Sequence, residues 1–207
     1  MKTILKSSVL ALVAVIAGTG LAFSAPAIGE KAPEFKGKTM NGDIVSLSDF
    51  QGKKVILEWT NHECPFVIKH YDTGNMQQLQ EETTEDGVVW LSIVSSAEGK
   101  QGYTDPETAK QVVEEVGAKA TDRILDPEGE IGKAYQAKTT PHMFIIDEEG
   151  MLVYQGAIDD NSSPRPGTVE GAKNYVRAAL DDLEAGRNVQ VASTKPYGCS
   201  VKYDNMF

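Results

Sequence analysis

A cysteine at the start of a predicted helix is the most reactive feature of this 207-residue sequence. Cys64 follows the apolar run 55–59 (VILEW) and directly precedes Pro65. Proline favours the first position of a helix, so Cys64 is expected where backbone N–H groups and the helix dipole stabilise a thiolate. The thiolate is the nucleophile in disulfide and peroxide chemistry, and this position should lower the pKa of Cys64 below the free value of about 8.5. The alternative is an inert cysteine that packs as a small hydrophobe.

Cys199 is the only other cysteine, and it lies in the segment 187–207, which lacks helical or strand periodicity. It could be a resolving thiol that closes a disulfide with Cys64 during turnover, one half of a permanent disulfide, or a link to another subunit. A permanent disulfide would be worth up to about 5 kcal/mol. We favour an intramolecular link to Cys64, reversible or permanent, because the sequence of the tail shows no other anchor.

Glu58 is the first candidate for moving a proton at the thiol. It lies inside the apolar run 55–59, where a charged carboxylate is costly to bury. Desolvation would raise its pKa and let it accept or donate a proton in the thiol step. A position on the solvent-facing side of the strand is the alternative and would give it no such role.

The three histidines supply further acid–base candidates. His62 lies two residues before Cys64, and His142 directly follows Pro141. Each could act as an acid or base near neutral pH or stabilise a thiolate as a cation, and each could equally be an exposed side chain without function. His70 lies on the helix that follows Cys64 and is predicted to be on the surface.

Alternating strand and helix signals predict an α/β fold, with a mixed central sheet flanked by helices. The most apolar runs, 55–59 and 88–94, are predicted to be core strands covered on both faces. Proline at a first helical position predicts helices that start at Pro65 and Pro106, and apolar spacing predicts a last helix from Thr168. The remaining predicted elements are a hairpin within 29–48, a strand at 123–125, a helix at 131–135 and a hairpin over 143–155.

The N-terminus has the pattern of a secretory signal peptide, approximately residues 1–27. Two lysines precede an apolar stretch at 9–22, which is shorter than the roughly 20 residues that a membrane-spanning helix needs. Small residues follow, and cleavage fits after Ser24 or after Ala27. The mature chain is therefore expected to be secreted, most simply to a bacterial periplasm. An uncleaved membrane anchor is the minority alternative.

The remainder of the chain is predicted to be one domain, 28–186, followed by a C-terminal tail, 187–207, that carries Cys199. Loss of the two lysines of the leader changes the formal net charge from −10 to −12. Such an acidic chain argues against nucleic acid and anionic membrane surfaces as partners. No membrane contact is expected beyond the signal peptide, and the sequence sets no expectation for the oligomeric state.

Two features resemble the thioredoxin superfamily. Glu58 lies six residues before Cys64, where thioredoxins carry a buried acid beneath the active site. Thr140-Pro141 resembles the cis-proline loop that faces the active-site cysteine and shapes the substrate groove. The resemblance implies a thioredoxin-like fold over roughly residues 28–185, with Pro141 in the cis form.

Three segments resemble the redoxin branch of that superfamily, which holds AhpC/TSA peroxiredoxin-like proteins and exported thiol–disulfide oxidoreductases: 29–35 (GEKAPEF), 47–53 (LSDFQGK) and 126–135. The resemblance implies an exported thiol-based oxidoreductase, either a thiol–disulfide oxidoreductase or a thiol peroxidase. Its partners would be a protein thiol or disulfide, or a hydroperoxide, together with an external thiol reductant. Neither a cofactor (none) nor a metal is expected.

Neither parental motif is complete in this chain. The second cysteine of the thioredoxin motif C-x-x-C is replaced by Val67, and Thr60 lies four residues before Cys64, where peroxiredoxins place a threonine three residues before theirs. A lone active-site thiol can attack a disulfide but cannot resolve the mixed disulfide that forms. Cys199 or an external thiol is therefore expected to complete the reaction, with Thr140 and Pro141 positioning the substrate.

Two other functions are open at this point. The chain could be a non-catalytic thioredoxin-fold binding domain with a structural disulfide. It could also be a copper-binding module, as in copper chaperones of this fold, with ligands from Cys64, Cys199, His62 and His142. Against copper, those chaperones carry two cysteines at the helix start. The acidic run 159–161 lacks the spacing of a calcium loop and is predicted to be an ordinary loop.

Overall fold

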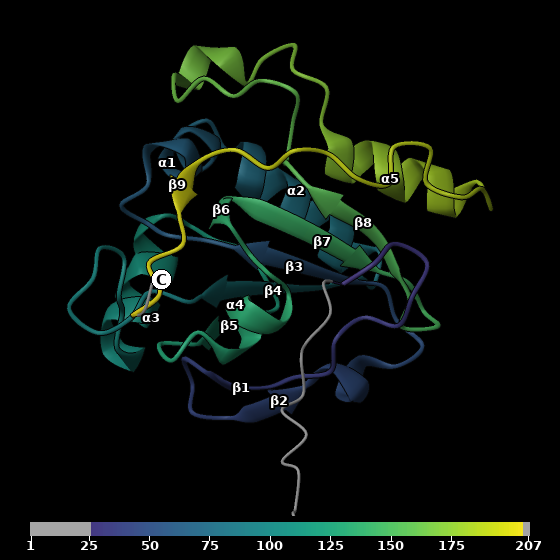
Figure 1. Cartoon of the computed structure of the whole chain (residues 1–207). Coiled ribbons are helices and arrows are strands. Elements are labelled where there is room, and N and C mark those ends of the chain that lie inside the picture. Colours follow the sequence, from purple (N-terminus) through teal and green to yellow (C-terminus); the bar gives the residue numbers. More distant parts are fainter. Residues whose placement is uncertain (1–25, 205–207) are drawn as a thin grey trace, which may run out of the picture.

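A seven-stranded mixed sheet forms the centre of the molecule in the computed structural model, which describes residues 26–204 (Figure 1). The strands β3, β4 and β5 run parallel, and every other pairing in the sheet is antiparallel. In order across the sheet, the strands are β2 (Ile44–Ser46), β1 (Lys36–Thr39), β5 (Asp122–Leu125), β4 (Val89–Val94), β3 (Val55–Trp59), β7 (His142–Ile146) and β8 (Leu152–Gly156).

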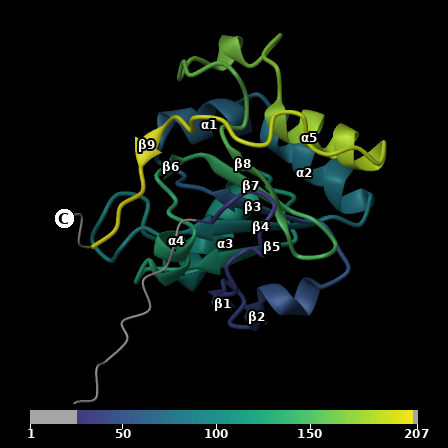
Figure 2. The same ribbon diagram turned by 45° about the vertical axis from the view of Figure 1, so that its right-hand side comes forward.

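Helices cover both faces of this sheet, as Figures 1 and 2 show. The helices α1 (Pro65–Asp72), α2 (Asn75–Glu85) and α5 (Tyr175–Glu184) pack on one face. The short helices η1 (Leu47–Phe50) and α4 (Glu130–Ala134) pack on the other. The helix α3 (Pro106–Glu115) connects β4 to β5, and η2 (Pro166–Thr168) precedes α5. This arrangement confirms the predicted thioredoxin-like α/β fold.

The strand that leads to Cys64 is buried along its whole length. Successive side chains of a strand point to opposite faces, so Ile56 packs under α1, α2 and α5 while Leu57 and Trp59 pack in the cluster on the other face. Parallel pairing of β3 with β4 keeps both strands in the middle of the sheet. The apolar runs predicted to be core strands are therefore confirmed, and together they fix the loop that carries Cys64.

The last helix begins at Tyr175, and the prediction that it starts at Thr168 is wrong. Residues 166–168 make a single turn of 3-10 helix, and Gly171 then adopts a positive φ of 78°, which ends helical geometry. Asn174 restarts it, because its side chain accepts a hydrogen bond from the Arg177 N–H at 3.0 Å. The helical spacing of the apolar residues continues across this break, so the sequence pattern did not reveal it.

The tail after α5 returns over the molecule to the N-terminal end of α1, as Figures 1 and 2 show in yellow. Its short strand β9 (Cys199–Ser200) pairs with β6 (Thr139–Thr140) in a separate two-stranded sheet. Further along, the Val201 N–H donates to the Lys138 carbonyl at 3.1 Å, and the Val201 side chain is buried. The tail is thus held at Cys199 and directly after it, by contacts that no periodic pattern predicted.

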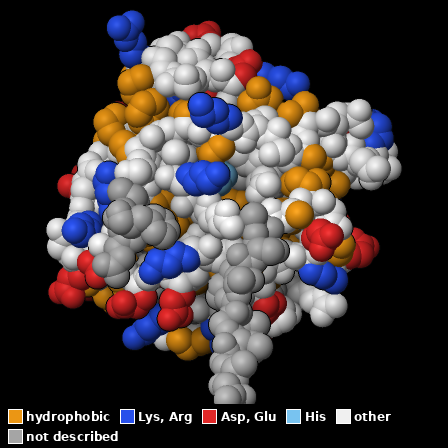
Figure 3. Space-filling model, viewed as in Figure 1, with side chains coloured by type: hydrophobic (Ala, Val, Ile, Leu, Met, Phe, Trp, Pro, Cys, Tyr) orange, Lys and Arg blue, Asp and Glu red, His pale blue; other side chains and the backbone are white. Residues whose placement is uncertain are grey.

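Acidic and basic side chains are interspersed on the face of the molecule drawn in Figure 3. The net charge of −10 is therefore not gathered into a single acidic patch on that face. Among the residues from 26 to 204, no helix has the length and apolar character that crossing a bilayer requires. Residues 1–25 of the predicted signal peptide lie outside the part of the chain that the structure describes.

Replacing Asn174 with Ala should lower the free energy of unfolding by about 1 kcal/mol, because the first turn of α5 loses its side-chain cap. The matched change Thr168→Ala should alter stability by less than about 0.5 kcal/mol, since Thr168 does not begin a helix. Urea unfolding of the two variants measures both values. Equal losses, or a larger loss for Thr168→Ala, would contradict the assigned start of α5.

Candidate functional site

Cys64 is the residue immediately before α1, at the end of the loop that leaves β3. Its backbone carbonyl accepts hydrogen bonds from the N–H groups of Val67 and Ile68, both at 2.9 Å. Its side chain is 0% exposed. The Cys64 Sγ donates to the backbone carbonyl oxygen of Thr140 at 3.1 Å. The thiol is therefore buried, and the segment that covers it comes from the loop before β7.

Thr140 brings the two cysteines together. The Thr140–Pro141 peptide bond is cis, which confirms the prediction for Pro141. The same Thr140 is the ladder partner of Cys199 in the β6–β9 pairing, so one residue contacts Cys64 and faces Cys199. Both cysteines carry free thiols, and Cys199 is partly exposed. Burial, with added effects of the neighbouring Cys64, raises the pKa of the Cys199 thiol to about 11.

A glycine allows the tail to lie this close to the cis-proline loop. Gly198 has a φ of 132°, a conformation that residues with a side chain rarely adopt. A Cβ atom at this position would overlap the Thr140 carbonyl oxygen. The contact between tail and loop therefore depends on the absence of a side chain directly before Cys199.

The Glu58 carboxylate is fully buried on the α1 side of the sheet and accepts three side-chain hydrogen bonds. The donors are the Tyr71 hydroxyl at 3.1 Å, the Gln80 amide at 3.0 Å and the Trp90 indole at 2.9 Å. Burial nevertheless raises the pKa of Glu58, and the hydrogen bonds and the Arg123 charge oppose this rise only in part. The solvent-facing alternative is therefore wrong. The three donors come from α1, α2 and β4, and none is a cysteine.

The family model described as AhpC/TSA matches residues 28–155. The chain belongs to the AhpC/TSA family. The match includes β3, Cys64 and the cis-proline loop, and it ends before the tail that carries Cys199.

Relatives with known names place this AhpC/TSA chain in the class of peroxiredoxin-like and thiol–disulfide oxidoreductase proteins. A peroxiredoxin-type protein (bcp) of Coxiella burnetii is 30% identical over 138 residues, which cover 60% of this chain and 84% of the relative. The thiol-disulfide oxidoreductase ResA of Bacillus cereus is 29% identical over 128 residues, covering 62% of this chain and 68% of that protein.

Solved structures agree on the fold. A conserved protein of Geobacillus kaustophilus is 30% identical with a TM-score of 0.75, covering 87% of this chain and 94% of its own. A DsbE-type thiol:disulfide interchange protein of Chlorobium tepidum is 25% identical with a TM-score of 0.52, over 63% of this chain and 85% of its own.

His142 lies directly after the cis-proline and is buried. Burial, with a smaller contribution from the Lys138 charge, lowers the pKa of His142 to about 3. Its Nδ1 accepts a hydrogen bond from the Lys138 N–H at 3.3 Å, and the ring lines a cavity of about 170 Å³ with Pro196 of the tail. The lowered pKa favours the neutral imidazole near pH 7, and a neutral ring carries no charge with which to stabilise a thiolate.

His62 is half-buried in the loop before Cys64. Burial lowers its pKa, and it lines a cavity of about 40 Å³ together with Thr60 and the buried Arg123. Among the described residues, neither the His62 ring nor the His142 ring is hydrogen-bonded to a cysteine. The structure therefore places both histidines beside the cysteine loop and cis-proline loop without joining them to a thiol.

Within residues 26–204, no group of three or more His, Cys, Asp or Glu side chains is placed to hold a metal ion. The four residues considered for copper, Cys64, Cys199, His62 and His142, are therefore not assembled into such a group among the described residues.

A buried polar cluster beside the tail was missed by the sequence patterns. His70 is 0% exposed, so its predicted surface position is wrong, and Asp159, predicted to lie in an ordinary loop, is 3% exposed. His70 lies three residues after the core residue Val67, at helical spacing, which was the available signal. Its residue type instead favoured the surface.

Replacing Glu58 with Gln should make the variant more stable relative to wild type as the pH rises. Burial holds the folded-state pKa of Glu58 above the unfolded value of 4.5, so the folded chain retains this proton more strongly. Wild-type stability from this group is therefore complete below the unfolded pKa and is lost as the pH rises through the folded pKa. Gln does not titrate and removes this loss.

The measurement is the difference in free energy of unfolding between Glu58→Gln and wild type, from urea titrations between about pH 4.5 and 8. Subtraction removes the groups that the two proteins share. Glu128→Gln, at an exposed carboxyl, is the matched control for the substitution of Glu by Gln. A difference for Glu58→Gln that does not change with pH would contradict the buried titration.

Replacing Gly198 with Ala should speed alkylation of Cys64 by iodoacetamide roughly tenfold, because positive φ and overlap with Thr140 disfavour the docked tail. Peptide mapping by mass spectrometry follows each cysteine separately. Gly117→Ala is the matched control, since Gly117 also has a positive φ but an added Cβ meets no atom within 4 Å. Equal rates for Gly198→Ala and wild type would show that the tail does not protect the thiol.

Proposed function

We propose that this AhpC/TSA family member is an exported two-thiol oxidoreductase, in which Cys64 attacks a disulfide or a hydroperoxide and Cys199 resolves the product. The observation that carries the proposal is the position of Thr140. The Thr140 carbonyl oxygen lies 3.1 Å from the Cys64 Sγ, and Thr140 is also the strand partner of Cys199. A second thiol thus lies beside the helix-start cysteine, although Val67 occupies the usual C-x-x-C position.

With a disulfide substrate, the Cys64 thiolate attacks one sulfur and expels the other half of the substrate as a thiolate. The Cys199 thiol then loses its proton, its sulfur attacks the Cys64 sulfur of the mixed disulfide, and the second substrate thiolate leaves and takes up a proton. The substrate disulfide gains two electrons, and the two protein thiols lose them as the Cys64–Cys199 disulfide forms. An external thiol pair reverses this and restores the protein.

With a hydroperoxide, the Cys64 thiolate attacks the terminal oxygen, the O–O bond breaks, and an alcohol or water leaves after taking up a proton. Cys64 becomes a sulfenic acid. The Cys199 thiol attacks its sulfur, and water leaves as the same disulfide forms. Both substrates therefore converge on one product, which an external thiol reductant reduces.

Glu58 is proposed as the proton-holding group beneath this site. The support is its burial on the α1 side of the sheet and the rise that burial causes in its pKa, which keeps a proton available closer to neutral pH. Thr140 and Pro141 are proposed to shape the substrate approach, with His62 and His142 lining the flanking cavities.

Export is part of the proposal because the predicted signal peptide precedes the domain at 28–186. An oxidising compartment would supply disulfide substrates and would allow a Cys64–Cys199 disulfide to persist between turnovers. The family model matches residues 28–155, so its match ends before the tail. The tail would then supply the resolving thiol that the domain itself lacks.

In reduced wild-type protein, a hydroperoxide or a disulfide substrate should convert both thiols into one Cys64–Cys199 disulfide that mild reductant reopens. Cys64→Ser should lose activity by roughly a thousandfold or more, since the nucleophile is gone. Cys199→Ser should make one attack and then stop as a mixed disulfide or a sulfenic acid. Alkylation followed by peptide mass spectrometry identifies each species.

Ser200→Ala is the matched control, because Ser200 is the exposed neighbour of Cys199 in β9 and should leave turnover unchanged. Full activity of Cys64→Ser would overturn the proposal. A Cys64–Cys199 disulfide that resists reductant in the folded protein would assign the non-catalytic binding domain with a structural disulfide. The rate with each substrate class then decides between peroxidase and disulfide activity.

A further inference from the structure

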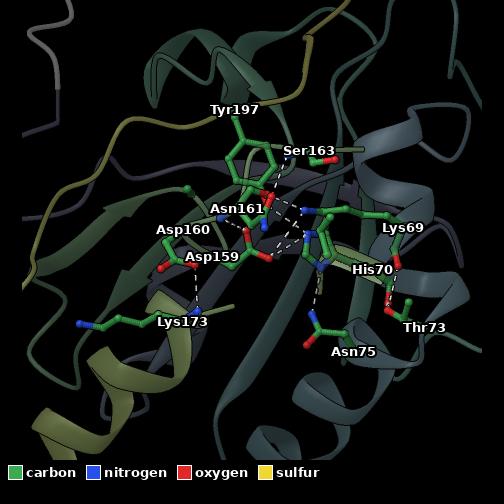
Figure 4. Close-up of polar contacts among 12 residues, drawn as sticks. Lys69, His70, Thr73, Asn75, Asp159, Asp160, Asn161, Ser163, Lys173 and Tyr197 are labelled. Atoms are coloured by element: carbon green, nitrogen blue, oxygen red, sulfur yellow. Dashed lines mark hydrogen bonds and ion pairs between the residues drawn. The ribbon is translucent and has the colours of Figure 1, made fainter. Parts of the chain in front are cut away.

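Four residues form a pocket for one side chain of the tail, which we call the Tyr197 socket: Phe66, Lys69 and His70 of α1, and Asp159 after β8. Figure 4 shows Lys69, His70 and Asp159 pointing toward the Tyr197 hydroxyl. Tyr197 lies two residues before Cys199, and the proposed mechanism gives it no role. The socket joins helix α1, which begins after Cys64, to the tail that carries the second thiol.

The polar and charged members of the socket are almost wholly buried. Lys69 and His70 are 0% exposed and Asp159 is 3% exposed. The Lys69 ammonium lies 3.7 Å from Asp159 Oδ2 and donates to the Asn161 carbonyl at 2.7 Å. Burying a lysine is costly without such partners, so the Asp159 charge compensates for Lys69. The other oxygen of the same carboxylate, Oδ1, accepts hydrogen bonds from the Asn161 N–H at 3.0 Å and from the Tyr197 hydroxyl of the tail.

The hydrogen bonds in the socket form a chain in which each group donates to the next, from Asn75 through His70 and Tyr197 to Asp159. The Asn75 side-chain amide donates to His70 Nδ1 at 3.0 Å, which places the proton of the neutral ring on Nε2. His70 Nε2 then donates to the Tyr197 hydroxyl at 3.3 Å. Tyr197 in turn donates to Asp159 Oδ1. Burial, with added repulsion from Lys69, lowers the pKa of His70 to about 3, consistent with the neutral ring.

The Tyr197 ring is held as well as its hydroxyl. Its centroid lies 6.0 Å from that of Phe66, and the Lys69 ammonium lies 4.9 Å from the ring centroid, within the range of a cation–π contact. The socket therefore fits an aromatic side chain with a hydroxyl group at its end. A phenylalanine would keep the ring contacts and lose only the hydrogen bonds.

Two residues of extended chain span about 7 Å, so an anchored Tyr197 leaves Cys199 little freedom of position. Gly198 between them lies against the Thr140 carbonyl, and Cys199 then enters β9 opposite Thr140. On the far side, Val201 is fixed to Lys138. Tyr197 is the nearest side chain before Cys199 that anchors the tail to the domain.

We propose that the Tyr197 socket positions Cys199 for attack on Cys64, so that Asp159 and Tyr197 set the rate at which the internal disulfide closes. This inference rests on the proposed two-thiol function and adds positioning residues to it. The residues act through the tail and need not touch the substrate. Loss of the socket hydrogen bond should therefore slow closure without slowing the first attack on an external disulfide.

The test uses the chromogenic disulfide dithiobis-nitrobenzoate with the reduced full-length protein. A protein thiolate attacks the reagent, forms a mixed aryl disulfide and releases one aryl thiolate, at a rate proportional to reagent concentration. The other cysteine then attacks the mixed disulfide and releases a second aryl thiolate, at a rate that does not depend on the reagent. Stopped-flow absorbance separates the two phases, and mass spectrometry confirms that no aryl group remains on the chain.

Tyr197→Phe should slow the second, reagent-independent phase about tenfold, as expected for loss of one hydrogen bond to a charged group. The first phase should keep its rate or become faster, because a loosened tail uncovers Cys64. This opposite response distinguishes positioning from a general loss of stability. Tyr135→Phe is the matched control: it removes a tyrosine hydrogen bond, at 2.7 Å to the Pro33 carbonyl, on the other face of the sheet, and should change neither phase.

Asp159→Asn and the double variant complete the test. If Tyr197 and Asp159 act through one hydrogen bond, the double variant should close no more slowly than the slower single variant. A closure rate of Tyr197→Phe within twofold of wild type, or effects that multiply in the double variant, would overturn the socket inference. A second phase in wild type that depends on reagent concentration, with aryl groups retained on both cysteines, would instead overturn the two-thiol function itself.

Discussion

The backbone of Thr140 is the contact on which the arrangement of this molecule depends. Its carbonyl oxygen meets the Cys64 thiol, its peptide bond to Pro141 is cis, and its strand pairing holds Cys199. Each contact constrains the others, because a residue in a two-stranded ladder cannot shift without breaking its pairing. The position of Thr140 is in turn fixed by β7, which pairs with β3 directly before the cysteine loop. The central sheet therefore sets the geometry between two thiols that are far apart in the sequence.

The tail is stable on this surface because it combines many small contacts with a few buried ones. Val201 and part of Tyr197 enter the protein, while much of the remaining tail is exposed or half-buried. Apolar burial alone would be modest for so short a segment, so the directional bonds at Tyr197 carry more of the specificity. A buried lysine beside Asp159 is costly in isolation, and it is tolerated where both charges have partners. The buried charges of the socket, Lys69 and Asp159, both lie outside the tail. Docking of the tail therefore requires only that the Tyr197 side chain enters the socket.

The sequence predicted those parts of the fold that local patterns determine. Strands β3 and β4 are continuous apolar runs, and proline marks the starts of α1 and α3. These two strands and these two helix starts were therefore predictable. The start of α5 was not, because a positive φ at Gly171 interrupts a pattern that otherwise keeps helical spacing. The socket was also beyond local patterns. Lys69 and His70 have residue types of the surface, and their partner Asp159 lies about ninety residues away in the chain.

The position of the second thiol has consequences for access. In the C-x-x-C arrangement both sulfurs lie on one helix turn, but here Val67 fills that place and is part of the core. The second thiol instead lies on a strand that pairs with Thr140, the residue whose carbonyl oxygen contacts the fully buried Cys64 thiol. In the proposed mechanism, firm docking of the tail would favour fast closure of the disulfide and would hinder any substrate larger than a small molecule. A protein substrate would have to displace β9 from Thr140, whereas a small oxidant needs only a brief opening. In the proposed two-thiol mechanism, the strength of tail docking thus couples resolution by Cys199 to substrate size.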